Sequence, residues 1–283
     1  MRGTLVKIKQ GFDTFKPSEK KIAQYILEHP EELKNLSITE LSDKSNTSEA
    51  SIVRFCKSLG LKGYQELKID VSLEISQRRT PPKVFFEQID TDDSANDIIM
   101  KVASGNIQAL KDTTKILSPD ELERAIEAIY KAKSINVFGV GASSIVALDL
   151  QYKFMRINIP TYMFFDTHMQ LTSAVNLSKE DVAIGISYSG STKEVVDALR
   201  IAKEKGATTI CITKYGDSPI VSTSDIKLFI AAVENNFRSA AMASRIAQLN
   251  IVDSLFVGVA CKLYDEVIDY LYKTREVVKD KKY

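Results

Sequence analysis

Three hydroxyl side chains stand close together near the middle of the 283-residue chain, within the stretch Ser187-Tyr188-Ser189-Gly190-Ser191-Thr192. Ser187, Ser189 and Thr192 can donate hydrogen bonds to phosphate oxygens, and Gly190 lets the backbone approach an anion without a side chain in the way. The stretch lacks the Gly-Lys-Ser/Thr of a Walker motif, which favours a holder of a phosphorylated small molecule over a site that transfers a phosphoryl group. An ordinary capped Ser/Gly-rich turn is the alternative interpretation.

The segments on either side predict the elements that position this loop. Residues 181–186 form an almost uncharged apolar run, typical of a strand covered on both faces in a parallel sheet. Residues 193–205 carry apolar side chains at helical spacing, and Gly206 is placed to end that helix. Ser191 and Glu194 have the spacing of a capping box, so the helix is expected to begin inside the loop. Its N-terminus would add unpaired N–H groups and a partial positive charge to an anion site.

Strands and helices alternate from residue 134 onward. Four further strands are predicted at residues 135–138, 161–165, 207–213 and 226–231. Five strands with intervening helices predict a doubly wound α/β fold with a parallel sheet, in which ligands bind at the carboxyl ends of the strands near the topological switch point. The loop Gly139-x-Gly141-x-Ser143 follows the first strand and is therefore expected at the same edge as Ser187. It lacks the third glycine and the acidic residue of a dinucleotide site, which disfavours a nicotinamide enzyme.

The first part of the chain has an all-α pattern. One helix is predicted to begin at Pro17 and to break at His29-Pro30, and a second begins at Ser37, which forms a capping box with Glu40. A third helix is predicted from Thr47 or Ser48 to Gly60 after a short polar turn, and this outline is that of a helix-turn-helix. A plain three-helix bundle with a solvated polar face is the alternative.

In a helix-turn-helix the third of these helices enters the DNA major groove. The residues expected to face outward from it, or to follow it, and to contact DNA are Ser48, Ser51, Arg54, Lys57 and Lys62. The serines can reach phosphates or base edges, Arg54 can hold a guanine bidentately, and the lysines suit phosphates.

A linker divides the chain. A helix expected from Lys68 to Arg79, with Ile69, Leu73 and Ile75 as its apolar positions, must stop at Thr80-Pro81-Pro82. The predicted organisation is a helix-turn-helix domain at residues 1–77, a linker at 78–94 and the α/β domain with flanking helices at 95–283.

Composition bounds the class of protein. A hydrophobic content of 44% and a charged content of 27% are typical of a globular chain, and the net charge of +1 is too small to argue for nucleic-acid binding by itself. No apolar stretch is long enough to cross a bilayer and no signal-peptide core is seen, so a cytoplasmic protein is expected. Three scattered cysteines and two histidines predict neither a disulfide framework nor a metal site, and no cofactor is expected.

The motifs resemble two known families. Residues 134–260 resemble a sugar isomerase (SIS) domain in Val137-Phe138-Gly139-Val140-Gly141-Ala142-Ser143, in the Ser187 loop and in Ser244-Arg245-Ile246-Ala247-Gln248-Leu249. Residues 1–77 resemble the helix-turn-helix of RpiR-type bacterial transcription regulators, most clearly from Ser51 to Tyr64.

The resemblance implies a repressor or activator, a homodimer or homotetramer, that binds a double-stranded DNA operator and senses a phosphorylated sugar. By the family pattern, Ser187, Ser189, Gly190 and Thr192 hold the phosphate, Ser143 adds a hydroxyl, and His168 contacts the sugar.

Two other functions stay open. SIS isomerases move a proton between adjacent sugar carbons, and Glu234 or His168 would be the base in a ketose-aldose isomerase with an accessory helical domain. A sugar-phosphate-binding module that controls a protein partner is the third possibility.

Overall fold

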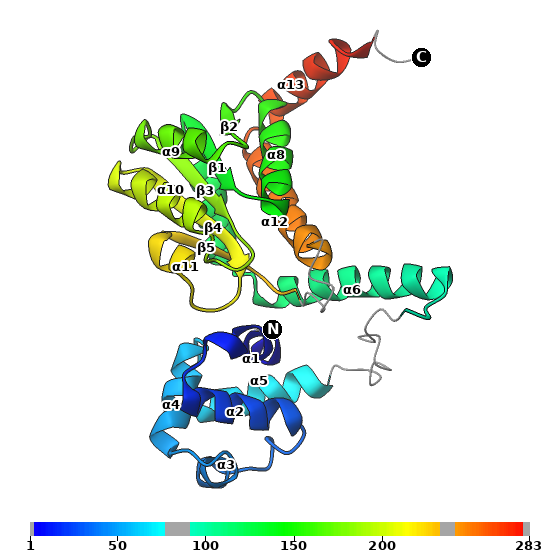
Figure 1. Cartoon of the computed structure of the whole chain (residues 1–283), viewed down its shortest axis with the longest axis vertical. Helices are drawn as coiled ribbons and strands as arrows, with labels where there is room; N and C mark the ends of the chain where they lie inside the picture. The colour runs from blue at the N-terminus through cyan, green and yellow to red at the C-terminus, as the bar shows by residue number, and fades with distance from the viewer. Residues whose placement is uncertain (1–2, 77–90, 233–240, 280–283) are drawn as a thin grey trace. The chain divides into compact units, whose positions relative to one another are not determined.

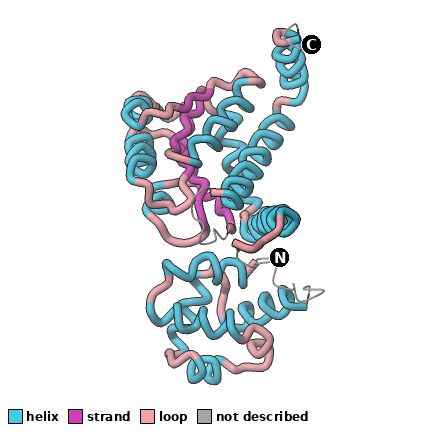
Figure 2. Tube along the Cα trace, turned by 45° about the vertical axis from the view of Figure 1, so that its right-hand side comes forward, coloured by secondary structure: helices cyan, strands magenta, loops and turns pink. Residues whose placement is uncertain are grey.

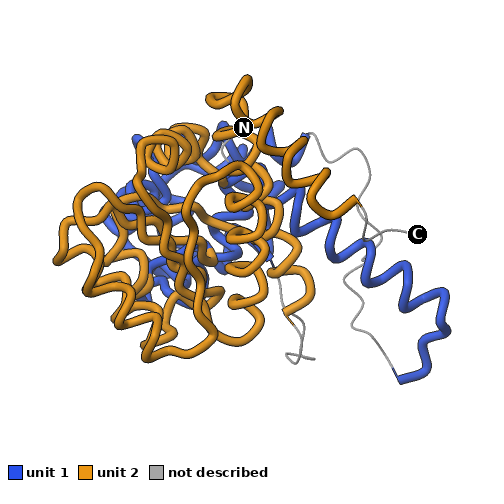
Figure 3. The backbone as a smooth tube through the Cα atoms, turned by 90° about the horizontal axis from the view of Figure 1, so that it is seen from above, with its two compact units in different colours: residues 1–116, 215–217, 231–236 blue, residues 117–214, 218–230, 237–283 orange. Residues whose placement is uncertain are grey.

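The computed structural model describes residues 3–76, 91–232 and 241–279. The chain forms two compact units, coloured separately in Figure 3, and each is described by itself. Unit 1 comprises residues 1–116, 215–217 and 231–236, and unit 2 comprises residues 117–214, 218–230 and 237–283.

Unit 1 is helical. Its elements are α1 (Thr4–Gly11), a 3-10 turn η1 (Phe12–Thr14), α2 (Pro17–Glu28), α3 (Ile38–Lys44), α4 (Glu49–Ser58), α5 (Tyr64–Ser76) and α6 (Ala95–Ile116). The core of the first five helices is built around fully buried residues such as Ile8, Ile22, Phe55 and Leu67. The predicted N-terminal helices at Pro17, Ser37 and Ser48 are confirmed, and the capping box of Ser37 and Glu40 is formed on both sides.

Two features of unit 1 differ from the prediction. Helix α1 was not predicted, and its first turn is held by the buried Glu74, whose carboxylate accepts a hydrogen bond of 2.9 Å from the Leu5 amide. Helix α5 begins at Tyr64, before Lys68, and it buries Leu67 and Val71 while Ile69 and Leu73 are exposed. The buried face of α5 is therefore rotated by part of a turn from the predicted one. The prediction was wrong because aliphatic residues lie on both sides of the helix.

Helix α6 belongs to unit 1, although the predicted division assigns residues 95–116 to the second domain. Its Thr113 hydroxyl accepts a hydrogen bond from the Ala231 amide at 3.0 Å. The same hydroxyl donates to the Ala231 carbonyl at 3.3 Å. The predicted linker at 78–94 lies largely outside the described residues, so the domain boundary stays a prediction.

Unit 2 is a doubly wound α/β fold, as predicted. Its parallel sheet has the order β2-β1-β3-β4-β5, with β1 (Ser134–Gly139), β2 (Thr161–Met163), β3 (Asp181–Ile186), β4 (Thr208–Lys214) and β5 (Ile226–Ile230). The helices are α7 (Pro119–Lys131), α8 (Ala142–Met155), α9 (Thr167–Val175), α10 (Lys193–Glu204), α11 (Pro219–Thr223), α12 (Met242–Lys262) and α13 (Tyr264–Glu276). Figure 2 shows the strands lying between helices on both sides.

The two faces of the sheet are covered by different helices (Figure 1). Alternate strand residues such as Val137 and Ile184 pack with α7, α8 and α12 on one face. Their neighbours, Phe138 and Ala183, pack with α9, α10 and α11 on the other. Both faces of β3 are therefore covered, which explains why its residues after Asp181 form an uninterrupted apolar run rather than an alternating one.

Within the described residues, no single helix is long and apolar enough to cross a membrane. The pair α12 and α13, bent by 114° at its break, passes that test of length and composition together, as the mostly buried core helix of a globular protein also can.

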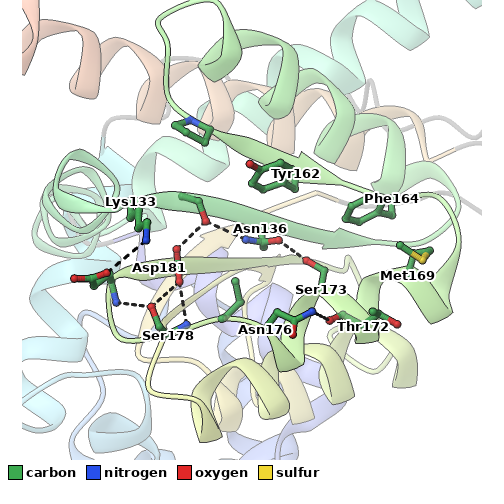
Figure 4. A pocket seen from close by; sticks show the side chains of 14 residues that line it. Lys133, Asn136, Tyr162, Phe164, Met169, Thr172, Ser173, Asn176, Ser178 and Asp181 are labelled. Atoms are coloured by element: carbon green, nitrogen blue, oxygen red, sulfur yellow. Dashed lines mark hydrogen bonds and ion pairs between the residues drawn. The ribbon is translucent and has the colours of Figure 1, made fainter.

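One buried carboxylate ties the starts of β1 and β3 together (Figure 4). Asp181 accepts hydrogen bonds from the Ser134 hydroxyl at 2.7 Å, from the Ser178 hydroxyl at 2.8 Å and from the Ser178 amide at 2.9 Å. Burial acts to raise the pKa of Asp181, but these hydrogen bonds to the charged form outweigh it and the pKa is lowered.

We expect Asp181→Asn to cost on the order of 1–3 kcal/mol of stability at pH 7, since charge-assisted hydrogen bonds are lost. A lowered folded-state pKa gives stability that is present above the ordinary aspartate pKa of about 3.9 and is lost as the pH falls through the folded-state value. Urea unfolding from pH 7 to pH 3 should therefore be less acid-sensitive for Asp181→Asn than for the wild type. Glu266→Gln, at an exposed position of α13, serves as the control, and equal pH profiles for all three proteins would contradict the assignment.

Candidate functional sites

The carboxyl ends of β1 and β3 form the topological switch point of the sheet. The two strands are paired, with Gly139 opposite Ile186, but α8 leaves β1 toward one face and α10 leaves β3 toward the other. A crevice at such a point is where open α/β sheets bind ligands. The loops that carry Ser143 and Ser187 open here, as predicted.

The loop after β3 is a short, internally hydrogen-bonded cradle. The Ser187 and Thr192 hydroxyl oxygens lie 3.0 Å apart, the Gly190 amide donates to the Ser187 carbonyl at 3.2 Å, and the Ser187 amide donates to the Ile212 carbonyl of β4. Ser187 is buried, whereas the Ser189 side chain is exposed. The three predicted hydroxyl residues are thus within one loop at the switch point, and their role with a ligand stays a prediction.

Helix α10 begins one residue later than the predicted capping box requires. Its N-cap is Thr192, and the Ser191 amide donates to the Ser189 hydroxyl at 3.2 Å. The capping box of Ser191 and Glu194 was therefore wrong. Among the described residues, Thr192 makes no side-chain cap to the helix, because its hydroxyl faces Ser187 instead, so the first amides of α10 stay available to an anion.

Gly190 is required by the shape of the cradle. Its φ is +68°, and a Cβ at this position would lie 2.2 Å from the Ser218 hydroxyl oxygen. The Ser218 hydroxyl is itself buried and has no hydrogen-bond partner among the residues that the structure describes. The close approach of these two segments leaves room only for glycine.

The other two predicted ligand residues lie at the same edge of the sheet. Ser143 is the second residue of α8 and is half-buried, and His168 is exposed in the first turn of α9, which follows β2. Glu234, the second candidate base of an isomerase, lies outside the described residues. Across residues 3–76, 91–232 and 241–279, no group of acidic, histidine or cysteine side chains is arranged to hold a metal ion.

The sequence interpretation missed Gln170, which fixes two of these loops. Its side chain is 1% exposed, and its amide oxygen accepts from the Gly139 amide at 3.2 Å. Its amide nitrogen donates to the carbonyls of Gly139 at 3.0 Å and of Phe164 at 2.7 Å. Gln170 thereby joins the ends of β1 and β2 to α9, but a lone glutamine carries no pattern that sequence reasoning could use.

The helix-turn-helix consists of α3 and α4, joined by residues 45–48. Asn46 takes a left-handed φ of +48°, and the Ser45 hydroxyl closes the turn by donating to the Leu41 carbonyl at 2.7 Å. Ser48 is the N-cap of α4 and accepts from the Ser51 amide at 3.2 Å. The turn is thus short enough to hold α3 and α4 as one rigid unit.

Four of the five predicted DNA contacts are exposed on α4 or next to its ends. Ser48, Arg54 and Lys57 are exposed, and Lys62 is exposed just beyond the helix. Ser51 is buried at 6% exposure, so its predicted outward position was wrong. Its hydroxyl lies 2.9 Å from the Ser48 hydroxyl and accepts from the Arg54 guanidinium at 3.1 Å, which positions Arg54 instead.

A separate cavity of about 790 Å³ lies along β2 and α9, beside the Asp181 network (Figure 4). Its floor is polar but hydrogen-bonded within itself, since the Ser173 hydroxyl donates to Asn136 and Asn136 donates to Ser134. Tyr162, Phe164 and Met169 form its apolar wall. None of the predicted site residues lines it.

The two buried cysteines, Cys56 of unit 1 and Cys211 of unit 2, are not reactive sites. Burial raises the pKa of Cys56 and of Cys211 to about 11, so neither is a ready thiolate.

A helix-turn-helix followed by a doubly wound domain is the arrangement of ligand-responsive DNA-binding regulators. Two family models match the chain accordingly. The helix-turn-helix domain of the rpiR family matches residues 2–78, and the SIS domain matches residues 128–258. The chain belongs to the RpiR family of helix-turn-helix transcriptional regulators that carry a SIS domain.

Relatives along the whole chain agree with this assignment. An uncharacterized HTH-type transcriptional regulator of Caldanaerobacter subterraneus is 49% identical over 100% of this chain and 99% of its own length. HexR, an HTH-type transcriptional regulator of Pseudomonas aeruginosa, is 33% identical over 98% and 95%. The solved structure of Vibrio vulnificus NanR complexed with ManNAc-6P is 32% identical, covers 99% of both chains and has a TM-score of 0.62.

We expect Gly190→Ala to destabilise unit 2 more than Gly206→Ala does. Both glycines have positive φ and both substitutions incur backbone strain of about 1–2 kcal/mol, but a Cβ at Gly206 meets only ordinary contacts beyond 3.6 Å. The clash with Ser218 is added only at Gly190. Thermal unfolding of the two variants measures the difference, and equal melting temperatures would contradict the close packing of the cradle.

Proposed function

We propose that this protein regulates transcription in response to a phosphorylated sugar bound at the carboxyl edge of its SIS sheet. The observation that carries the proposal is the convergence of the Ser187 and Thr192 hydroxyls, the exposed Ser189 and the open N-terminus of α10 at the switch point. The complex of NanR with ManNAc-6P supports a sugar phosphate as the ligand class.

In the proposed complex the phosphate lies in the cradle. The hydroxyls of Ser187, Ser189 and Thr192 and the amides of α10 donate to it, and Gly190 allows the close approach. The 3.0 Å contact between Ser187 and Thr192 holds both hydroxyls on one side of the loop before the ligand arrives. Ser143 and His168 then face the sugar from the neighbouring strands β1 and β2.

Helix α4 is the proposed recognition helix. Arg54, held by Ser51, reads a base edge in the major groove, while Ser48, Lys57 and Lys62 contact phosphates. A homo-oligomer, a dimer or a tetramer, presents paired copies of α4 to half-sites about 34 Å apart. Effector binding shifts the arrangement of the copies and so the affinity for the operator.

In the proposed role the protein does not catalyse a reaction. It acts in the cytoplasm, where the operator DNA lies. Relatives across the whole chain are named as transcriptional regulators. An isomerase assay with several sugar phosphates tests this part, since turnover that Glu234→Gln abolishes would favour the isomerase.

We expect Ser189→Ala to weaken effector binding about 10-fold or more, because a hydrogen bond to a charged phosphate is lost. Thermal stabilisation of the protein by ManNAc-6P and by other hexose phosphates reports the affinity through mass action. Ser191→Ala is the matched control, since Ser191 lies in the same loop and its hydroxyl bonds only weakly to the Ser189 carbonyl, at 3.4 Å. An effector response unchanged in a folded Ser189→Ala variant would refute the phosphate assignment.

We expect Arg54→Lys to reduce discrimination between the selected operator and a scrambled duplex, because the flexible lysine ammonium lacks the planar, rigid fork of the guanidinium. Lys57→Ala should weaken both duplexes alike and lower the slope of log affinity against log salt by about 1. Fluorescence anisotropy with a duplex that the wild type selects from a random library measures both. The recognition role fails if Arg54→Lys discriminates as well as the wild type.

A further inference from the structure

Besides the Ser218 hydroxyl, a buried side-chain amide of unit 2 is left without a hydrogen-bond partner among the described residues. Gln248 lies on the inner side of α12 and is 2% exposed. Its amide nitrogen is buried and has no hydrogen-bond partner among residues 3–76, 91–232 and 241–279. Buried donors are nearly always paired in native proteins, so an unpaired amide marks a place where a ligand or a water molecule can supply the acceptor.

The position of Gln248 along α12 follows from contacts between α12 and α8. The Lys153 ammonium of α8 lies 3.1 Å from the Asp253 carboxylate of α12, and the rings of Phe154 and Phe256 are 5.9 Å apart. Figure 1 shows both helices running away from the carboxyl edge of the sheet. At about 1.5 Å per residue, Gln248 lies roughly 7 Å from the Asp253 level toward that edge.

The start of α12 is therefore level with the start of α8. Ser144 and Ser244 each stand nine residues before the paired Lys153 and Asp253. Gln248, one turn beyond Ser244, is level with the second turn of α8, about one turn beyond Ser143. It thus lies on the α8 side of the switch point.

The cradle loop and α12 both contribute to the apolar cluster on one face of the sheet. Tyr188 packs against this cluster, and Ala247 and Ile251, on the same side of α12 as Gln248, belong to it. Helix α10, whose N-terminus is the proposed phosphate site, lies on the opposite face of the sheet. A ligand with its phosphate in the cradle would extend its sugar across the crevice toward α8 and α12.

We propose that the Gln248 amide donates a hydrogen bond to an acceptor oxygen on the sugar of the effector, which makes Gln248 a specificity-determining residue. The inference rests on the proposed function. Because the amide is covered, the side chains over it must move when the sugar binds, and the bond forms only in the effector complex. Gln248 then distinguishes a sugar phosphate from phosphate alone. The cradle cannot do so, because it binds only the phosphate group.

Two buried glutamines of unit 2 allow a matched test. Gln170 has its amide fully engaged, whereas the Gln248 amide nitrogen is unpaired. Without ligand, Gln170→Met should lower the melting temperature, since it leaves backbone groups of Gly139 and Phe164 unpaired. Gln248→Met should leave the melting temperature unchanged or raise it, because an apolar group of similar size replaces an unsatisfied donor.

The ligand arm uses ManNAc-6P, a panel of hexose 6-phosphates and inorganic phosphate as probes. For the sugar phosphate that stabilises the wild type most, Gln248→Met should bind about 10-fold more weakly or worse, with binding of inorganic phosphate unchanged. The proposal would be overturned if Gln248→Met kept its affinity for the sugar phosphate, or if it lost as much affinity for inorganic phosphate. It would also be overturned if the melting temperature of Gln248→Met fell as far as that of Gln170→Met. If no sugar phosphate stabilises the wild type, the proposed function fails and the role of Gln248 with it.

Discussion

The pairing of β1 with β3 is the constraint on which the rest of unit 2 depends. The two strands are neighbours in the sheet although β2 lies between them in sequence, so their following helices must leave on opposite faces. This divergence separates α8 from α10 and brings the segments that carry Ser143 and Ser187 to one edge of the sheet. The buried Asp181 fixes the start of this pair, and Gln170 fixes the end of β1. Polar groups thus anchor both ends of an otherwise apolar pair of strands.

The cradle depends on backbone shape as much as on its hydroxyl groups. Because the Thr192 side chain faces Ser187 and not the helix, α10 keeps its first amides open. Gly190 permits this arrangement, since any side chain there would meet Ser218. The loop is thus held in one conformation by its own contacts, and a ligand that bound there would lose less entropy in ordering it.

The sequence was sufficient for the fold class because its signals are strong and local. The apolar run of β3, the caps of α3 and α4 and the alternation of strands with helices all follow from short-range patterns. The placement of single side chains was less predictable. Ser51 has the composition of an outward residue, but it is buried as a partner of Ser48 and Arg54. The hydrogen bonds of Gln170 and the unpaired amide of Gln248 depend on elements far apart in the chain, so neither could be predicted from the sequence.

The central claim is that occupation of the SIS site changes DNA binding by the helix-turn-helix, and it is tested most directly by linkage. The affinity of the full-length protein for its selected duplex should be measured with and without the stabilising sugar phosphate, at fixed salt. We expect the affinity for the duplex to change by about 5- to 150-fold, and the duplex should change the affinity for the sugar phosphate by the same factor. Tight binding of both ligands with no effect of either on the other would contradict it.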